Sequence, residues 1–371
     1  MKVLFIGTTD FGGVSSYVSD LIKNSNNIKF YLLKDSFMDE SNLKDLYPNC
    51  TFIKFNQNYS FYFIRSVIRL RRHIIKSNID LVHAHTLRAG FQAAICKYFF
   101  CRKIKLVYTG HGLRFTQKKK YSNSLIFMFL ERVTNLISDK VVFIREIDLN
   151  LSLTNKITSP SKSIYIKTRI SPPIKSMKKI DIREEFDINT KYIVANAGSI
   201  YDLKNPELFI EIAKRTISLY KNITFIWFGE GDTRQRINQV LKAKGLTQYI
   251  KFVGPVKKEL MLSVYSQIDV FLLTSKVETF PTVILEAYMF QKLVFSSSFK
   301  GVEEIIKNGK TGVVFDEINS QNIHKYLVEL LHDRKSYNTI SKKGFDFFQN
   351  NFSDVNEFAE IHTKIYKQLI S

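Results

Sequence analysis

The chain has 371 residues, of which 45% are hydrophobic and 24% are charged, so it is long enough to form two globular domains. It contains no apolar run of roughly 18 residues, and the run Val3 to Ile6 is too short for a signal peptide. Its three cysteines show no pairing pattern. These features exclude a helical membrane protein and a disulfide-stabilised scaffold, and we expect a cytoplasmic protein.

The first predicted elements are a strand, a glycine turn and a helix. Val3 to Ile6 is the apolar strand, Gly12 and Gly13 form the turn, and a helical stretch follows as far as Lys23. Glycine lets the backbone approach a phosphate or a sugar without a clash from Cβ. A Gly-Gly pair is also common in ordinary turns, so both interpretations remain open.

Two apolar strands further along each end in a loop that carries histidine. His83 and His85 close the first strand, and His111 closes the second between two glycines. A single histidine is usually a packed or hydrogen-bonded residue. The flanking glycines give His111 room to reach a ligand, whereas we interpret His83 and His85 as structural or as facing an acceptor. Because no cysteine or carboxylate cluster accompanies them, we predict no metal site.

Positive charge is concentrated in the first half of the chain. The formal net charge is +21, and residues 54–120 supply +14 of it through 15 Lys or Arg against one acid, Asp80. A helix predicted over 61–76 carries four bases within a sector of about 60°: Arg65, Arg69, Arg72 and Lys76. This face either is simply solvated or is attracted to anionic lipid headgroups, with Lys118 to Lys120 adding to the attraction.

A domain boundary is predicted near Ser171-Pro172-Pro173 and the basic run 175–179, since paired prolines exclude a helix. Strands and helices alternate on both sides of this boundary, which predicts an α/β protein with two Rossmann-like, doubly wound parallel-sheet domains over residues 1–175 and 185–350. The strands predicted in the second half lie at 223–229, 250–254, 270–275, 293–297 and 312–315.

The most informative segment lies where the strand ending near Ser275 turns into a helix. Glu278 stands in the loop and Glu286 lies one helical turn further on. The free N–H groups at the start of a helix attract a diphosphate, and ionised carboxylates accept hydrogen bonds from sugar hydroxyls. One Glu near a helix start is also explained by capping alone. The residues around the predicted helix start are Thr279, Phe280, Pro281, Thr282 and Val283.

The segment Ser275 to Ala287 resembles the signature of glycosyltransferase family 4, whose members are retaining enzymes of the GT-B fold with two glutamates separated by seven residues. The resemblance extends to the glycine pair, to both histidine loops and to the strand that ends at Gly198. It implies that the two domains face a cleft and that a last helix within 354–371 crosses back to the N-terminal domain.

The resemblance also assigns roles to individual residues. It places the donor near Gly12, Gly13, the 279–283 loop and Glu286, and it assigns catalytic roles to His111, Lys204 and Glu278. Family members carry an Arg where this chain has Ser199, so a hydroxyl replaces one of two cations expected at the diphosphate. The candidates for a compensating cation are Arg88, Arg114 and Lys300.

The activity implied by the resemblance is sugar transfer from a nucleoside diphosphate sugar, UDP- or GDP-linked, without a cofactor or a metal. The expected acceptor is a lipid-linked sugar or a saccharide in surface polysaccharide synthesis, at the inner face of an anionic membrane. Two other classes stay open. High net charge is also the footprint of a nucleic-acid-binding protein, although no nucleic-acid motif is present, and a sugar-nucleotide epimerase or hydrolase uses the same fold.

Overall fold

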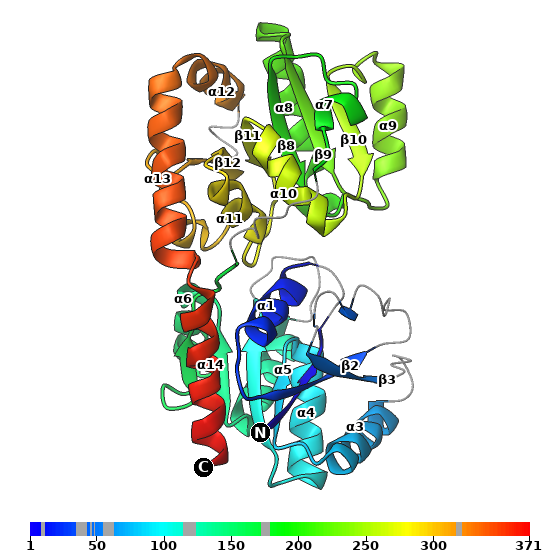
Figure 1. The fold of residues 1–371 in the computed structure, drawn as a ribbon, viewed down its shortest axis with the longest axis vertical. Coiled ribbons are helices and arrows are strands. Elements are labelled where there is room, and N and C mark those ends of the chain that lie inside the picture. The colour runs from blue at the N-terminus through cyan, green and yellow to red at the C-terminus, as the bar shows by residue number, and fades with distance from the viewer. Residues whose placement is uncertain are drawn as a thin grey trace. The chain divides into compact units, whose positions relative to one another are not determined.

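The computed structural model divides the chain into two compact units. Unit 1 comprises Met1–Ser171 together with Asp354–Ser371, and unit 2 comprises Pro172–Ser353 (Figure 1). Each unit has its own sheet and its own hydrophobic core. The structure describes residues 1–8, 12–34, 43–44, 47, 49–54, 63–113, 124–171, 179–316 and 321–371.

Unit 1 contains a seven-stranded sheet with the strand order β3-β2-β1-β4-β5-β6-β7, in which every neighbouring pair is parallel. The order reverses between β1 and β4. The strands are β1 (Lys2–Ile6), β2 (Lys29–Lys34), β3 (Cys50–Lys54), β4 (Leu81–Ala84), β5 (Lys105–Gly110), β6 (Lys140–Phe143) and β7 (Ser163–Tyr165). Their central members are buried throughout, as expected for a parallel sheet with both faces covered.

The helices of unit 1 follow its strands, and one returns from the C-terminus. They are α1 (Gly12–Lys23), α3 (Phe63–Ser77), α4 (Leu87–Phe100), α5 (Ser124–Ile137), α6 (Glu146–Thr154) and α14 (Val355–Ile370). The Thr86 side chain caps α4 by accepting a hydrogen bond from the N–H of Ala89, and the Asp354 side chain caps α14. α14 packs against α1, so the end of the chain completes the fold of unit 1.

Unit 2 contains a six-stranded parallel sheet with the order β10-β9-β8-β11-β12-β13, which reverses between β8 and β11. Its largest core side chain is the only tryptophan of the sequence, Trp227, which is fully buried among aromatic and aliphatic side chains. The strands are β8 (Tyr192–Ala197), β9 (Ile223–Phe228), β10 (Ile250–Gly254), β11 (Val270–Leu273), β12 (Leu293–Ser297) and β13 (Val313–Phe315).

Helices cover this second sheet as well. They are α7 (Ile182–Glu185), α8 (Pro206–Leu219), α9 (Arg234–Ala243), α10 (Lys258–Gln267), α11 (Thr282–Met289), α12 (Ile323–His332) and α13 (Arg334–Phe352), with short 3-10 helices η2 (Asp202–Lys204) and η3 (Val302–Glu304). Pro206 occupies the first turn of α8, where its missing N–H costs no hydrogen bond. The prediction of two Rossmann-like parallel-sheet domains is therefore confirmed.

The helix predicted over 61–76 corresponds to α3, whose described part begins at Phe63. The predicted strand 270–275 is shorter in the structure, because β11 ends at Leu273 and Thr274 instead binds the neighbouring loop. The basic run predicted at the domain boundary and Lys118 to Lys120 lie almost wholly outside the described residues.

Candidate functional site

The carboxyl ends of β8 and β11 carry an ion pair at the point where the strand order of unit 2 reverses. Lys204 follows β8 and Glu278 follows β11, and these parallel strands are hydrogen-bonded neighbours. Lys204 Nζ lies 2.5 Å from Glu278 Oε1, and the two side chains are only 20% and 9% exposed. Ser275 Oγ donates a further hydrogen bond of 2.6 Å to the same carboxylate oxygen. Open α/β sheets bind ligands at such reversal points.

The backbone around Lys204 is held by the residues after β11. Thr274 Oγ1 donates hydrogen bonds of 3.1 Å to the carbonyl oxygens of both Lys204 and Asn205. The N–H of Lys276 donates to the Leu203 carbonyl at 2.8 Å. Asn205 has a left-handed φ of 54°, which ends η2 and starts α8. These hydrogen bonds therefore hold the backbone of Lys204 in place.

Helix α11 starts directly after Glu278 and offers its N-terminus to the same edge of the sheet. Thr282 is its first residue, and Pro281 in the cap position forms no side-chain hydrogen bond to the first turn. Thr279, Phe280 and Val283 are half-buried in this loop and first turn. An uncapped helix start next to a lysine is favourable for an anion, because the helix dipole and the backbone N–H groups both attract negative charge.

Glu286 lies one turn into α11 and is half-buried. It lies near the buried Tyr265 of α10, where burial first and the Glu286 carboxylate second raise the pKa of the Tyr265 hydroxyl. Glu278 and Glu286 therefore stand on one loop and one helix of the same unit, as the sequence predicts. The Glu278 carboxylate accepts hydrogen bonds from Lys204 and Ser275.

The loop after β8 also contains Gly198 and Ser199, and it lies against the loop after β9. A Cβ at Gly229 would collide with the Gly198 carbonyl, and a Cβ at Gly231 would collide with the Ile200 carbonyl. Both glycines are thus required for this close approach. Ser199 is exposed, so the position where an Arg is expected holds a small solvent-accessible hydroxyl.

The three candidates for a compensating cation are placed differently. Lys300 follows β12, the next strand beyond β11, and is exposed at the same edge of the unit 2 sheet as Glu278. Arg88 belongs to α4 of unit 1, and Arg114 lies outside the described residues. Lys300 is therefore the candidate that unit 2 itself supplies.

Unit 1 holds Gly12, Gly13 and His111 at the corresponding edge of its own sheet. Gly12 and Gly13 are exposed at the start of α1, and Gly12 has a positive φ of 85° that favours glycine. His85 Nδ1 lies 3.1 Å from His111 Nε2. The sequence interpretation of His85 as structural is compatible with this contact, since it orients the His111 ring.

Four histidines and two tyrosines form a buried cluster around His111. His83 joins Tyr366 at 2.6 Å and Thr109 at 2.7 Å, and the Tyr17 hydroxyl meets His362 Nε2 at 2.8 Å. Because His362 Nδ1 donates to the Phe358 carbonyl, its Nε2 accepts from Tyr17. Sequence reasoning missed the contributions of α14 to this cluster. Their only signal is the four-residue spacing of His362 and Tyr366 on one helix face.

Burial lowers the pKa of every histidine in this cluster. The pKa of His111 falls to about 3 and that of His362 to about 4, and those of His83 and His85 lie well below their usual value. All four rings are therefore neutral near pH 7. His111 acts there as a hydrogen-bonding group and not as a cation.

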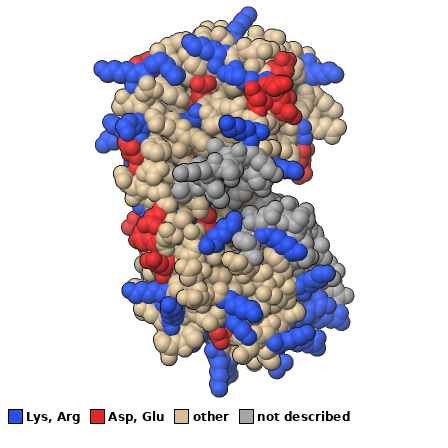
Figure 2. All heavy atoms as spheres, viewed as in Figure 1, with Lys and Arg blue, Asp and Glu red and all other residues tan. Residues whose placement is uncertain are grey.

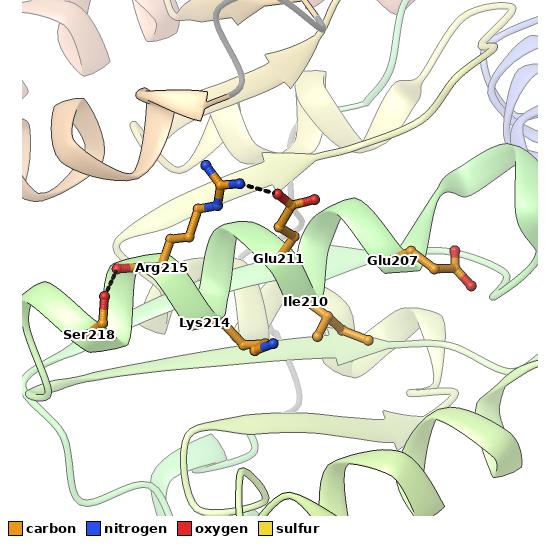
Figure 3. A pocket seen from close by; sticks show the side chains of 6 residues that line it. All are labelled: Glu207, Ile210, Glu211, Lys214, Arg215 and Ser218. Atoms are coloured by element: carbon orange, nitrogen blue, oxygen red, sulfur yellow. Dashed lines mark hydrogen bonds and ion pairs between the residues drawn. The ribbon is translucent and has the colours of Figure 1, made fainter.

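A hollow of about 540 Å³ lies along the exposed side of α8 (Figure 3). Its polar lining includes the Glu211–Arg215 ion pair, with 2.6 Å between Oε1 and Nη2. None of the residues predicted for the donor site lines it, so we do not assign the donor to this hollow. The side chains that line it are Glu207, Ile210, Glu211, Lys214, Arg215 and Ser218.

The residues that the structure describes contain no group of three or more His, Cys, Asp or Glu side chains arranged to hold a metal ion. None of the described helices combines the length and the apolar character needed to span a bilayer.

Two family models match the chain. Residues 178–347 match the glycosyl transferases group 1, and residues 2–140 match the glycosyl transferase 4-like family. Curated relatives include the alpha-D-kanosaminyltransferase of Streptomyces kanamyceticus, 24% identical over 72% of both chains. The UDP-Gal:alpha-D-GlcNAc-diphosphoundecaprenol alpha-1,3-galactosyltransferase of Escherichia coli is 24% identical over 80% of this chain and 78% of that protein. The capsular polysaccharide biosynthesis glycosyltransferase CapM of Staphylococcus aureus is 21% identical over 78% and 77%.

Solved structures show the same architecture. HepE of Anabaena, crystallised with UDP and glucose, has a TM-score of 0.82 and covers 99% of both chains at 17% identity. The sucrose-phosphate synthase of Thermosynechococcus elongatus has a TM-score of 0.80 and covers 99% of this chain and 98% of its own, also at 17% identity. The fold is thus GT-B, and the protein is a glycosyltransferase. It belongs to the family 4 type, in which a 4-like N-terminal half precedes a group 1 C-terminal half.

Proposed function

We propose that the chain is a retaining, metal-independent glycosyltransferase that moves a sugar from a nucleoside diphosphate sugar to a lipid-linked or saccharide acceptor in surface polysaccharide synthesis. The observation that carries this proposal is the Lys204–Glu278 pair beside the uncapped start of α11. The names of the galactosyltransferase and CapM relatives support the acceptor class, and the UDP complex of HepE supports a UDP-linked donor over a GDP-linked one.

In the proposed complex, the diphosphate competes with Glu278 for Lys204. The phosphate oxygens take hydrogen bonds from Lys204 Nζ and from the N–H groups at the start of α11, while Glu278 turns to the sugar hydroxyls and Glu286 to the ribose. His111 contributes a neutral imidazole that orients a sugar hydroxyl. No resident cofactor is required, because the donor itself carries the leaving group.

The transfer step that we propose is the one that the resemblance to the retaining family implies. The bond between the anomeric carbon and the diphosphate oxygen breaks, its electron pair stays on the diphosphate, and Lys204 with the α11 amides stabilises that negative charge. The acceptor hydroxyl oxygen bonds to the anomeric carbon on the face that the diphosphate leaves, and its proton passes to a phosphate oxygen. The sugar therefore keeps its anomeric configuration.

The basic surface of unit 1 supports a peripheral contact with an anionic membrane, which suits a lipid-linked acceptor. On α3 the residues Arg65, Arg69, Arg72 and Lys76 are exposed, whereas Val67, Leu70 and Ile74 are buried. Each basic side chain near a lipid surface contributes on the order of 1 kcal/mol at low ionic strength. This basic surface supports our proposal that the protein acts at the inner face of the cell membrane.

The donor proposal is tested by thermal stabilisation in EDTA with UDP, GDP, ADP and their common sugar conjugates. A ligand that binds only the folded state raises the melting temperature. We expect one base to raise it for the native chain and for a Glu329→Ala control on α12, and to raise it much less for Glu286→Ala. If no nucleotide shifts the melting temperature, or if Glu286→Ala responds like the control, the assigned site is wrong.

The reaction type is tested with the donor that this screen identifies. Incubation with and without a lipid-linked acceptor separates transfer from the alternatives, because a hydrolase or an epimerase changes the donor without any acceptor. The anomeric configuration of the product, read by NMR, tests retention, and unchanged turnover in EDTA tests metal independence. Salt-sensitive gel retardation of DNA or RNA without any nucleotide-sugar binding would favour the nucleic-acid class instead.

A further inference from the structure

Three neighbouring helices of unit 1 expose large apolar side chains. α4 packs against α3 and also against α5, so it lies between them. Eight of their apolar side chains are 47% to 70% exposed: Ile75 of α3, Tyr98, Phe99 and Phe100 of α4, and Leu125, Ile126, Phe129 and Leu136 of α5. The rings of Tyr98, Phe99 and Phe100 adjoin one another. Large exposed apolar patches mark sites that another molecule covers.

The topology brings most of these side chains to one end of the unit. α3, α4 and α5 lie beside parallel strands and run back along the sheet, so their C-terminal ends point to the same edge, the one at which the strands begin. Ile75, Phe99 and Leu136 all belong to the last turn or the last residues of their helices. Phe129 lies on the same face of α5 as Leu136, seven residues earlier. We call this region the α3–α5 surface.

The charges around the apolar side chains have one sign. Arg71, Arg72 and Lys76 are exposed on α3, and Arg102 and Lys103 are exposed just after α4. Figure 2 shows Lys and Arg atoms gathered at the lower right, over the region where Figure 1 places α3.

Among the described residues beside these helices the acidic groups are few, and Asp80, just before β4, accepts a hydrogen bond from the backbone N–H of Lys2. α3 and α4 contain no acidic residue, and Glu131 of α5 is fully buried. Asp139, just after α5, is paired with Lys97. Among the described residues, the α3–α5 surface therefore combines apolar side chains with a predominantly basic rim.

We propose that the α3–α5 surface inserts Phe99, Phe129 and their apolar neighbours into the headgroup boundary of an anionic bilayer while the basic rim pairs with lipid phosphates. The proposal rests on the peripheral contact proposed above and adds an apolar anchor to it. A second copy of the chain would bring two basic rims together, which like-charge repulsion disfavours. Nucleic acid would leave exposed aliphatic groups such as Leu136 without a partner.

The test is flotation of the full chain with neutral phosphatidylcholine vesicles and with vesicles that also contain phosphatidylglycerol, at low and high salt. We expect binding to the anionic vesicles, part of which survives high salt because apolar insertion is not screened. Phe99→Ser combined with Phe129→Ser should lower the partition coefficient about tenfold or more and remove the salt-resistant part. The matched control is Leu219→Ser combined with Val240→Ser, which changes two exposed apolar residues of unit 2 and should leave binding unchanged.

A fluorescence readout tests insertion directly. The only native tryptophan, Trp227, is buried in unit 2, so a Phe99→Trp variant adds a distinct reporter on the α3–α5 surface. We expect a blue shift and quenching by brominated lipid in this variant but not in the native chain. Absence of quenching would overturn the inference.

The outcomes distinguish this inference from the proposals on which it rests. Vesicle binding that disappears in high salt and is unaffected by the two serines would leave the electrostatic contact standing and overturn insertion. Absence of binding to any vesicle would overturn both. Self-association without lipid that the serines abolish would assign the surface to a second copy. The nucleotide screen needs no lipid, so it tests the donor proposal independently of membrane binding.

Discussion

At the scale of single residues, the proposed donor site depends on Lys204, whose ammonium binds the Glu278 carboxylate in the free protein and the diphosphate in the proposed complex. Lys204 is bound to Glu278 in the free protein, and the same ammonium is the cation that unit 2 offers next to the start of α11. Ser275 hydrogen-bonds Glu278 as well, so the carboxylate keeps a partner when the lysine turns to a ligand. Exchange of partners costs less than breaking a bond outright, because no buried charge is left unpaired.

We predict that Lys204→Ala weakens binding of the nucleoside diphosphate sugar by about 10- to 100-fold, the value of one charge-assisted hydrogen bond. Turnover should fall too, because the departing diphosphate loses its cation. Titration calorimetry and initial rates measure the two effects, with Lys214→Ala on the outer side of α8 as a control. If affinity and turnover both stay at the native level, the role assigned to Lys204 is wrong.

Ser199 allows the converse experiment, in which a cation is added to the proposed diphosphate site. Its side chain is exposed in the loop that also carries Lys204, so an arginine fits there without displacing core side chains. We predict that Ser199→Arg tightens nucleoside diphosphate binding by up to about tenfold through a bidentate phosphate contact. Ser199→Gln, long but uncharged, is the control and should not gain. Equal or weaker binding by the arginine variant would mean that this position does not reach the diphosphate.

At the scale of elements, α14 is joined to unit 1 by polar pairs inside an aromatic core. Tyr366 meets His83 on β4, and His362 meets Tyr17 on α1. Phe358 adds edge-on contact with the Tyr17 ring, at 4.8 Å between ring centroids. These groups are buried, so each hydrogen bond that is lost leaves an unsatisfied polar atom behind.

We predict that Tyr366→Phe destabilises unit 1 by about 1–3 kcal/mol, because one nitrogen of the buried His83 ring loses its partner. Urea unfolding followed by far-UV circular dichroism measures the loss. The fluorescence of Trp227 reports only unit 2 and should keep its midpoint, and Tyr326→Phe on α12 changes an exposed tyrosine as a control. An unchanged midpoint for unit 1 would show that this contact does not stabilise α14.

The elements differ in how far the sequence predicts them. The buried strands of unit 2 appear as continuous apolar runs, and the predicted 293–297 matches β12 because both faces of a parallel strand are covered. The pairing of Lys204 with Glu278 joins residues 74 positions apart, and that of His83 with Tyr366 joins residues 283 positions apart. No local pattern encodes such contacts, since they depend on the strand order. The return of α14 was implied by family resemblance and not by periodicity.

At the scale of the whole molecule, the two units differ in their sensitivity to acid. In unit 1 the pKa of each clustered histidine is lowered. Below about pH 6.5 the unfolded chain therefore binds protons at these histidines while the folded chain does not. The stability of unit 1 thus decreases as the pH decreases. In unit 2 burial raises the pKa of Asp269, so that group contributes stability as the pH falls through its folded pKa. Burial also lowers the pKa of His324 in unit 2, so shifts of both directions oppose one another there, whereas those of the clustered histidines in unit 1 all act in one direction.

We predict that acidification from pH 7 to pH 5 destabilises unit 1 by about 2 kcal/mol for each buried neutral histidine and leaves unit 2 nearly unaffected. The loss begins near the unfolded pKa of 6.5 and continues toward the folded values, about 4 for His362 and about 3 for His111. Thermal melts followed by far-UV circular dichroism at a series of pH values should show two transitions, of which one coincides with the Trp227 fluorescence transition and stays in place while the other moves to lower temperature. A common shift of both would mean that the units unfold as one, and a static first transition would mean that the histidines are not held neutral.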